Sequence, residues 1–136
     1  MASLAISVVV VSRNRPEWLR RCLSALRQLD YERFETIVVA CPSGAAIARE
    51  SGVDHVCDFD EANISAERNI GVDVASGEVV AFIDDDAVPE PTWLTYLCQP
   101  FLDPNVAASG GFVIGRNGIS FQWKARMAFA DGSAVP

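Results

Sequence analysis

Three aspartates stand side by side at Asp84, Asp85 and Asp86, directly after the apolar run VVAFI at residues 79–83. The run is short, contains β-branched and aromatic residues and follows a Ser-Gly pair, which is typical of a buried strand. Carboxylates at the end of a parallel strand lie in the crevice where open α/β sheets bind ligands. Adjacent negative charges repel one another unless a cation neutralises them. The pattern therefore predicts a divalent metal site completed by a phosphate-rich ligand. The alternative is a solvated acidic loop.

A sheet is needed to position these carboxylates, and apolar runs that alternate with helical patterns predict one. Strands are predicted at residues 5–11, 36–40, 55–57 and 79–83. The first predicted helix begins at the capping signal at Asn14 and runs through core positions such as Trp18 to Leu29. A turn at residues 41–44 is followed by a predicted helix over residues 45–50. Two further helices are predicted over residues 64–75, with a cap at Asn63 or Ser65, and over residues 93–101. A further strand-like segment, residues 106–114, is interrupted by Gly110-Gly111. The order predicts an α/β fold with a mostly parallel open sheet, flanking helices and right-handed crossovers.

The composition limits the class of protein and of partner. The chain has 136 residues, which is enough for one domain with a real core, and half of them are apolar, which argues against disorder. Its formal net charge of −7 argues against nucleic acid or an anionic membrane as the main partner. An anionic nucleotide would need a metal ion or local arginines to offset this charge.

The cysteines and the start of the chain indicate a cytoplasmic protein. Cys22, Cys41, Cys57 and Cys98 have no CxxC spacing and only one His accompanies them, so buried thiols are favoured over a zinc site. The apolar run at residues 5–11 follows no basic segment and is far shorter than a membrane span. We therefore expect it to be the first buried strand, with no membrane segment in this chain.

The last residues, 119–136, carry Phe121, Trp123, Met127 and Phe129 without a closing element after them. Exposed apolar clusters usually have a partner. The segment therefore predicts that residues 1–136 form a single, incomplete domain, in which these aromatic residues await missing sequence or support self-association.

Several motifs occur together in an order that resembles the family 2 glycosyltransferases of GT-A fold. They are SAERNIG at residues 65–71, ASGE at 75–78 and FIDDD at 82–86, which are similar to that family's SxxRNxG, AxGE and strand-ending DxD. The start VVVVSRNRP, residues 8–16, looks like the family's first strand and turn. The resemblance covers roughly residues 4 to 115, and its specificity lies in the order and spacing of several motifs together.

This resemblance implies a Rossmann-like, nucleotide-binding half that holds a UDP-, GDP- or dTDP-sugar and transfers the sugar, with inversion, to an unknown acceptor. By position, Ser12 and Arg13 would line the base and ribose pocket, and Asp84 would approach the ribose. Asp86 would coordinate Mg²⁺ or Mn²⁺ on the diphosphate, with Asp85 in support. A metal on the phosphate oxygens suits this chemistry, because glycosyl transfer needs a stabilised leaving group.

Arg68, in the SAERNIG motif, has two interpretations. An arginine in a crevice can form a structural ion pair with the acidic loop or contact a phosphate directly. The sequence does not choose between them.

The chain departs from the family pattern in two places. The family usually carries an acid after the second strand that reads the base, whereas this chain has ACPS at residues 40–43. We therefore expect relaxed or unusual base selectivity. The family's catalytic base lies well downstream of the DxD, and the acids available here are Glu90, Asp103 and Asp131, none within a matching motif. No catalytic base is assigned from the sequence.

Two other functions compete with a glycosyltransferase. One is a truncated, non-catalytic module that keeps nucleotide or partner binding but lacks the acceptor half, and the isolated chain is accordingly expected to show no sugar transfer. The other is a phosphoacceptor receiver domain, which also gathers acids around Mg²⁺. A receiver needs acids after the first strand, where this chain has SRNR at residues 12–15, so that interpretation is disfavoured.

Overall fold

A computed structural model describes residues 3–111, 113–114, 121–123 and 126–129, with side chains described through residue 111. The chain divides into two compact units, Met1–Pro91 and Thr92–Pro136. The single domain predicted over residues 1–136 stays a prediction.

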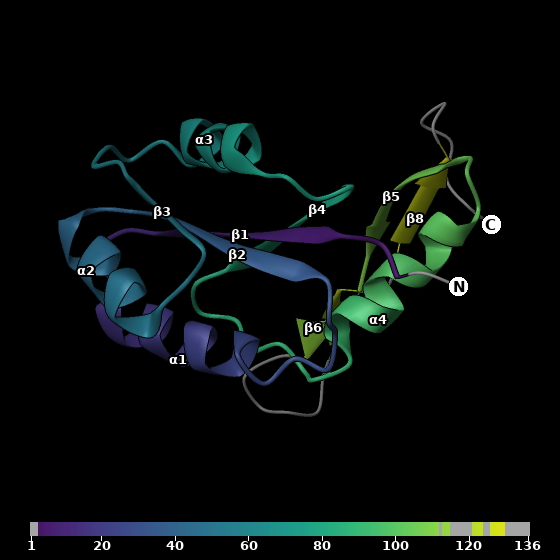
Figure 1. The fold of residues 1–136 in the computed structure, drawn as a ribbon, viewed down its shortest axis with the longest axis horizontal. Helices are drawn as coiled ribbons and strands as arrows, with labels where there is room; N and C mark the ends of the chain where they lie inside the picture. The colour runs from purple at the N-terminus through teal and green to yellow at the C-terminus, as the bar shows by residue number, and fades with distance from the viewer. Residues whose placement is uncertain (1–2, 112, 115–120, 124–125, 130–136) are drawn as a thin grey trace. The chain divides into compact units, whose positions relative to one another are not determined.

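The first unit is built on a four-stranded parallel sheet. Its strands are β1 (Ile6–Ser12), β2 (Phe34–Ala40), β3 (His55–Asp58) and β4 (Val79–Asp84), in the order β3-β2-β1-β4 (Figure 1). The mostly parallel open sheet is thus confirmed. β1 is central and almost wholly buried, with Val10 paired to Val38 on one side and Ile83 on the other. A strand covered on both faces reads as a continuous apolar run, which is why VVVV marks it in the sequence.

Three helices cover the two faces of this sheet. α1 (Pro16–Leu26) and α2 (Pro42–Ser51) lie on one face and α3 (Ile64–Val74) lies on the other (Figure 1). Alternation along β1 sends Val9 toward α3, where it joins a core with Ile37 and Val39. The apolar side of α1 is buried through Leu19, Cys22, Leu23 and Leu26.

α3 lies unusually close to β1 because a glycine faces the strand. A Cβ atom at Gly71 would lie 2.4 Å from Cγ1 of Val9, closer than real contacts allow. The helix begins at Asn63, whose side-chain oxygen accepts a hydrogen bond of 3.0 Å from the N–H of Ala66. This arrangement confirms Asn63 as the cap, one of the two predicted alternatives.

Three details of the first unit differ from the sequence predictions. The segment at residues 41–44 is not a turn, because α2 begins at Pro42, whose fixed φ suits the first helical position. Asn14 does not cap α1: it adopts a left-handed conformation with φ 55°, and Arg15 holds the cap position without a side-chain bond. Trp18 lies at the helix surface with 38% of its area exposed, so it is not a core residue.

The second unit contains α4 (Trp93–Cys98), a 3₁₀ turn (Gln99–Leu102) and short strands. The predicted helix over 93–101 changes to 3₁₀ geometry at Gln99, next to Pro100, which has no N–H to donate. The strands are β5 (Val106–Gly110), β6 (Val113–Ile114), β7 (Phe121–Trp123) and β8 (Arg126–Phe129). β5 pairs with β8 and β6 with β7, both antiparallel. The expected role of the side chains at 119–136 in self-association lies outside the described residues.

Candidate functional site

A crevice opens where β1 and β4 end. The chain passes from β1 to β2 on one side, whereas β4 joins β1 on the other, so the gap between β1 and β4 is a topological switch point. Open α/β sheets bind ligands at such points. The crevice has a volume of about 480 Å³ and is bounded by the ends of these two strands and the start of α3. Its lining residues are Val9, Val11, Arg13, Arg15, Ala62, Asn63, Ile64, Glu67, Arg68, Phe82, Ile83, Asp84, Asp85 and Asp86.

The three aspartates occupy different environments although they are consecutive. The side chain of Asp84 is 71% exposed, that of Asp86 is 36% exposed, and that of Asp85 is only 6% exposed. Ser12, at the end of β1, donates a hydrogen bond of 2.9 Å from Oγ to Oδ2 of Asp85. The outer two carboxylates are therefore open to a ligand, while Asp85 anchors the loop to β1.

Arg15 lies between two of the aspartates. Its guanidinium nitrogens lie 3.4 Å from Oδ1 of Asp85 and 3.1 Å from Oδ2 of Asp86, and its Cζ lies 5.9 Å from the centroid of the Trp18 ring. The sequence motifs assign no site role to Arg15. The left-handed conformation of Asn14 and the start of α1 at Pro16 place it at the crevice.

Arg68 projects from α3 toward the end of β4. Its Nη2 atom lies 3.6 Å from Oδ1 of Asp84, and its Cζ lies 5.7 Å from the Phe82 ring centroid. The ion pair with the acidic loop, one of the two predicted interpretations, is therefore present. Direct contact with a phosphate stays a prediction.

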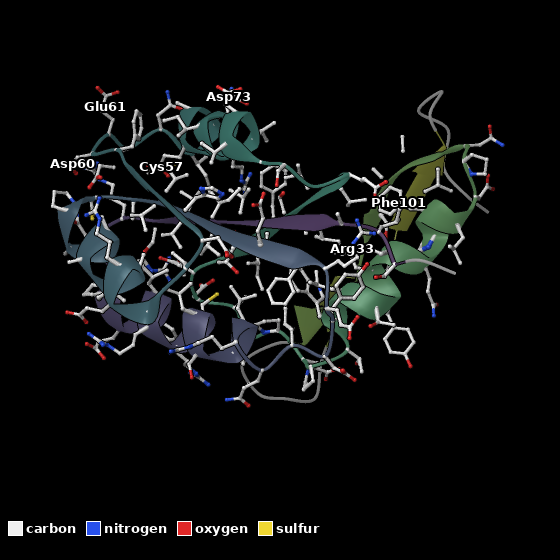
Figure 2. All side chains as sticks on the ribbon, in the orientation of Figure 1. Arg33, Cys57, Asp60, Glu61, Asp73 and Phe101 are labelled. Carbon is white, nitrogen blue, oxygen red and sulfur yellow. The ribbon has the colours of Figure 1, made fainter. Side chains whose placement is uncertain are left out.

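A second group of charges lies near the start of α3. Arg13 pairs with Asp60 at 3.1 Å between Nη1 and Oδ1, while Nη1 is buried and has no partner in hydrogen-bond geometry. Asp60 and Glu61 lie on the loop between β3 and α3 (Figure 2). Glu67, in the first turn of α3, is only 4% exposed and also lines the crevice. Sequence reasoning missed Asp60 and Glu67, because neither stands at the end of a strand facing the acidic motif.

Burial sets the electrostatics of this edge. It raises the pKa of the Asp85 carboxyl, against the lowering effects of Ser12 and Arg15, and the charges of Asp86 and Asp84 raise that pKa further. Burial also raises the pKa of the Cys22 thiol to about 12, and the charges of the three aspartates add to this rise. Cys22 is therefore a packing residue, since a thiol needs its thiolate form to react.

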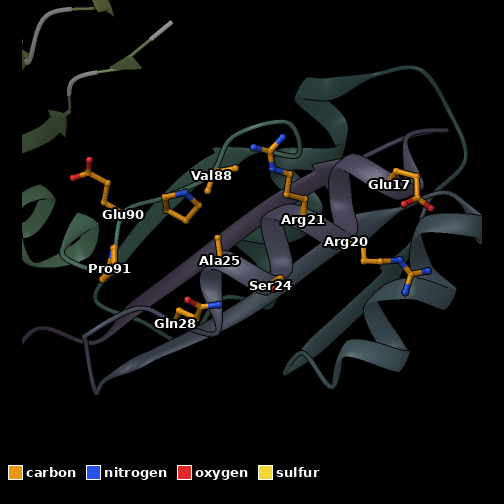
Figure 3. A pocket seen from close by; sticks show the side chains of 10 residues that line it. Glu17, Arg20, Arg21, Ser24, Ala25, Gln28, Val88, Glu90 and Pro91 are labelled. Carbon is orange, nitrogen blue, oxygen red and sulfur yellow. The ribbon is translucent and has the colours of Figure 1, made fainter. Parts of the chain in front are cut away.

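Glu90, the first of the downstream acids, does not line this crevice. Glu90 lines a separate groove of about 740 Å³ that runs beside α1, bounded by Arg21, Ala25 and Pro91 among others (Figure 3). Asp103 lies in the second unit, where its Oδ1 accepts a hydrogen bond of 2.9 Å from the N–H of Asn105. Asp131 lies outside the described residues. The larger groove has no aspartate cluster, so the crevice at the strand ends is the stronger candidate site.

The mostly parallel sheet with flanking helices is a Rossmann-like fold of the GT-A type. A solved mannosyltransferase from Pyrobaculum calidifontis, in complex with GDP-Man and Mn²⁺, matches with a TM-score of 0.71 at 20% identity, over 78% of this chain and 34% of that one. TarS of S. aureus, in complex with UDP-GlcNAc, matches with a TM-score of 0.62 at 23% identity, over 75% of this chain and 32% of that one. At these identities the likeness shows the fold alone.

The chain belongs to glycosyl transferase family 2, whose model matches residues 7–134. It is 32% identical over 108 residues to the pre-mycofactocin glycosyltransferase of Mycobacterium tuberculosis, covering 75% of this chain. It is 31% identical over 121 residues to the glucosyl-dolichyl phosphate glucuronosyltransferase of Haloferax volcanii, covering 82% of this chain. The chain spans only 22% and 39% of the lengths of these two relatives.

Within the described residues, no helix is both long and apolar enough to cross a membrane.

Proposed function

We propose that this chain binds the donor of a glycosyltransferase, a UDP-, GDP- or dTDP-sugar, in the crevice between β1 and β4, and that the enzyme transfers the sugar with inversion to an acceptor. Arg13 lines the base and ribose pocket, Asp84 approaches the ribose, and Asp85 supports the loop. Ser12, which was predicted beside Arg13, does not line the crevice and instead holds Asp85 through its hydroxyl. Family membership supports the reaction class. The observation that carries the proposal is the gathering of Arg13, Arg15 and Arg68 with three aspartates at the switch point of a parallel sheet.

We further propose that Asp86 coordinates Mg²⁺ or Mn²⁺ when the donor is bound. In the part of the chain that the structure describes, no group of three or more His, Cys, Asp or Glu side chains is arranged to hold a metal ion. The exposed Asp84 and half-exposed Asp86 nevertheless fit a cation that takes one or two carboxylates and fills its other positions with substrate phosphates and water. Such a cation would stabilise the leaving diphosphate.

The arginines are placed to share the charge of the diphosphate. Arg15 and Arg68 each pair with an aspartate across a partly exposed contact, so either can turn toward an anion that enters the crevice. Among the described residues none is assigned as the catalytic base, which must reach the acceptor hydroxyl. The four described cysteines are all free, which supports the proposal of a cytoplasmic protein.

Calorimetric titration of UDP, GDP and dTDP, each with and without Mn²⁺, tests the donor site. We expect at least one nucleotide to bind more tightly with Mn²⁺, because the cation offsets the repulsion between phosphate and carboxylates. Asp86→Asn should remove this Mn²⁺-dependent gain. The matched control is Asp73→Asn, which removes one charge from an exposed position on α3 and should leave the gain intact.

Failure of all three nucleotides to bind at millimolar concentration with Mn²⁺ would refute the donor site. Equal loss of the gain in both variants would show that net charge, and not Asp86, governs binding. Radiolabelled nucleotide-sugars offered with a panel of acceptors would then separate a complete transferase from a nucleotide-binding module.

A further inference from the structure

Glu67 is a mostly buried acid whose carboxyl faces the crevice. Its residue is 4% exposed, and within the described residues its carboxyl forms no hydrogen bond. Burial raises the pKa of this carboxyl, against the lowering effect of the Arg13 charge. The carboxyl oxygens of Glu67 are not among the buried atoms without a partner, so they are open to the crevice and can accept a hydrogen bond from a ligand that enters it.

Arg13 supplies the complementary group. Its guanidinium is close enough to Glu67 for its charge to act on that carboxyl, and both residues line the same crevice. Its Nη1 atom is buried and makes no hydrogen bond, although Asp60 lies 3.1 Å away as an ion-pair partner. The crevice therefore offers one buried donor without a hydrogen-bond partner and one carboxylate that is open to a ligand.

The turn after β2 does not supply an acid to this crevice. Ala40 and Cys41 are buried, and none of residues 40–43 lines it. In the family pattern, a carboxylate in that turn reads the base. This chain has no such carboxylate at residues 40–43. Glu67 reaches the crevice from the opposite face of the sheet, on α3.

We propose that Glu67, together with Arg13, reads the base of the donor nucleotide and selects lactam bases, namely guanine, uracil and thymine, over adenine and cytosine. This inference rests on the proposed donor site. A lactam presents a ring N–H beside an exocyclic carbonyl oxygen. The carboxylate of Glu67 accepts from the ring N–H, and the guanidinium of Arg13 donates to the carbonyl oxygen.

Adenine and cytosine present the reverse pattern, with an exocyclic amine beside an unprotonated ring nitrogen. Because the ribose and diphosphate fix the direction in which the base edge runs, the amine would meet Arg13 and the ring nitrogen would meet Glu67. Both groups would then have no hydrogen-bond partner in the complex. Buried polar groups left unpaired in this way disfavour the binding of a wrong ligand.

A merely structural role for Glu67 predicts a different outcome. An acid in the first turn of a helix is stabilised by the positive end of the helix dipole. Its loss would then weaken all nucleotides alike or lower the melting temperature. The ratio of affinities between bases, and not the affinity itself, is therefore the informative measurement.

The experiment is calorimetric titration of GDP, UDP, CDP and ADP in Mn²⁺ with the full chain and with Glu67→Gln. For the wild type we expect GDP and UDP to bind at least about tenfold more tightly than CDP and ADP, the range that one bidentate contact provides. Glu67→Gln should reduce this preference below about threefold, because an amide can turn either its oxygen or its N–H toward the base.

The matched control is Glu61→Gln, which removes the same charge from an exposed position on the preceding loop and should preserve the wild-type ratio (Figure 2). Arg13→Gln provides a second variant with the same expected loss of selectivity, should Glu67→Gln fail to fold. Equal wild-type affinities for the four bases, or an unchanged ratio in a folded Glu67 or Arg13 variant, would overturn the inference while leaving the donor site standing. Absence of all nucleotide binding would overturn both.

Discussion

At the scale of single residues, Asp85 is the aspartate that the fold removes from water. It keeps a hydrogen bond from Ser12 and an ion pair with Arg15, and both oppose the cost of its burial. This carboxylate holds the turn after β4 against the central strand β1. Asp84 and Asp86 stand on either side of it in the sequence. The positions of the two exposed carboxylates therefore depend on a contact that no ligand needs to touch.

Substitution of Ser12 tests this anchoring role. Ser12→Ala should lower the free energy of unfolding by about 1–3 kcal/mol, because it leaves a buried carboxyl without its donor. Urea unfolding followed by circular dichroism measures the change. Ser24→Ala, at an exposed position on α1, should have little effect or a slightly stabilising one, since alanine favours helices. Equal changes in the two variants would contradict the anchoring role.

At the scale of elements, the approach of α3 to β1 brings Glu67 and Arg68 to the crevice. Gly71 makes this approach possible, since it packs directly on Val9. One face of the helix therefore contacts the strand while its first turn faces the ligand. A change at this contact should move both charged residues together.

Gly71→Ala should destabilise the protein although alanine is the better helix former. The gain in helix propensity is about 1 kcal/mol, whereas overpacking against Val9 costs about 1–3 kcal/mol and displaces the helix. Thermal unfolding measures the net effect. Asp73→Ala on the same helix brings the propensity gain without the clash, so it should not destabilise.

A double variant separates the clash from other causes. Val9→Ala should cost less in the Gly71→Ala background than in the wild type, because the smaller strand residue relieves the contact. Additive costs would show that the two residues do not interact through packing.

The elements could be predicted from the sequence to the extent that local pattern determines them. The unbroken β-branched run of β1 and the Asn63 cap of α3 signal their structures without help from the rest of the chain. The segment at residues 41–44 was predicted wrongly because Cys-Pro-Ser-Gly fits a turn and a proline-led helix start equally well.

The site could be predicted from the sequence only for residues that lie at the end of a predicted strand. Ser12 and Asp84 are the last residues of β1 and β4, and Asp86 follows β4, so their gathering at one end of the sheet could be expected, while their roles stay predictions. The burial of Glu67 depends on how closely α3 packs on the sheet, which is a tertiary property. A glutamate in the first turn of a helix otherwise indicates only a favourable helix start.

At the scale of the first unit, one carboxylate links the N-terminal ends of the strands, at the end of the sheet opposite the crevice. Glu35 on β2 accepts hydrogen bonds from Oγ of Ser7 on β1 at 2.7 Å and from the N–H of Ser76 before β4 at 2.8 Å. His55 on β3 lies 3.2 Å from its other oxygen. One side chain thus links β1, β2 and β3 to the segment that leads into β4.

This cluster predicts a loss of stability in acid. Desolvation raises the pKa of Glu35, but the bonds from Ser76, Ser7 and His55 outweigh it and hold the pKa at about 2, against an ordinary value of 4.5. Because the folded-state pKa is the lower one, the stabilisation is present above pH 4.5 and is lost as the pH falls toward 2. Urea unfolding between pH 2.5 and 7 should show this decline.

Glu35→Gln should flatten the decline, so that its difference from the wild type is largest near neutral pH and shrinks in acid. Glu32→Gln, at an exposed neighbouring position, should follow the wild-type curve. A Glu35 variant with the same dependence on pH as the wild type would assign the acid sensitivity to other carboxyls.

The central place of β1 has a consequence for how the protein is made. Its partner β4 lies far along the chain, since Asp85 comes 73 residues after Ser12. At about 5–20 residues per second, a ribosome needs roughly 4–15 s to synthesise that interval. During this time the most apolar strand has an open edge that can pair with other nascent chains. Of the four strands of this sheet, β1 is synthesised first and gains its second partner last, so the yield of soluble protein should depend on the speed of translation and the supply of chaperones.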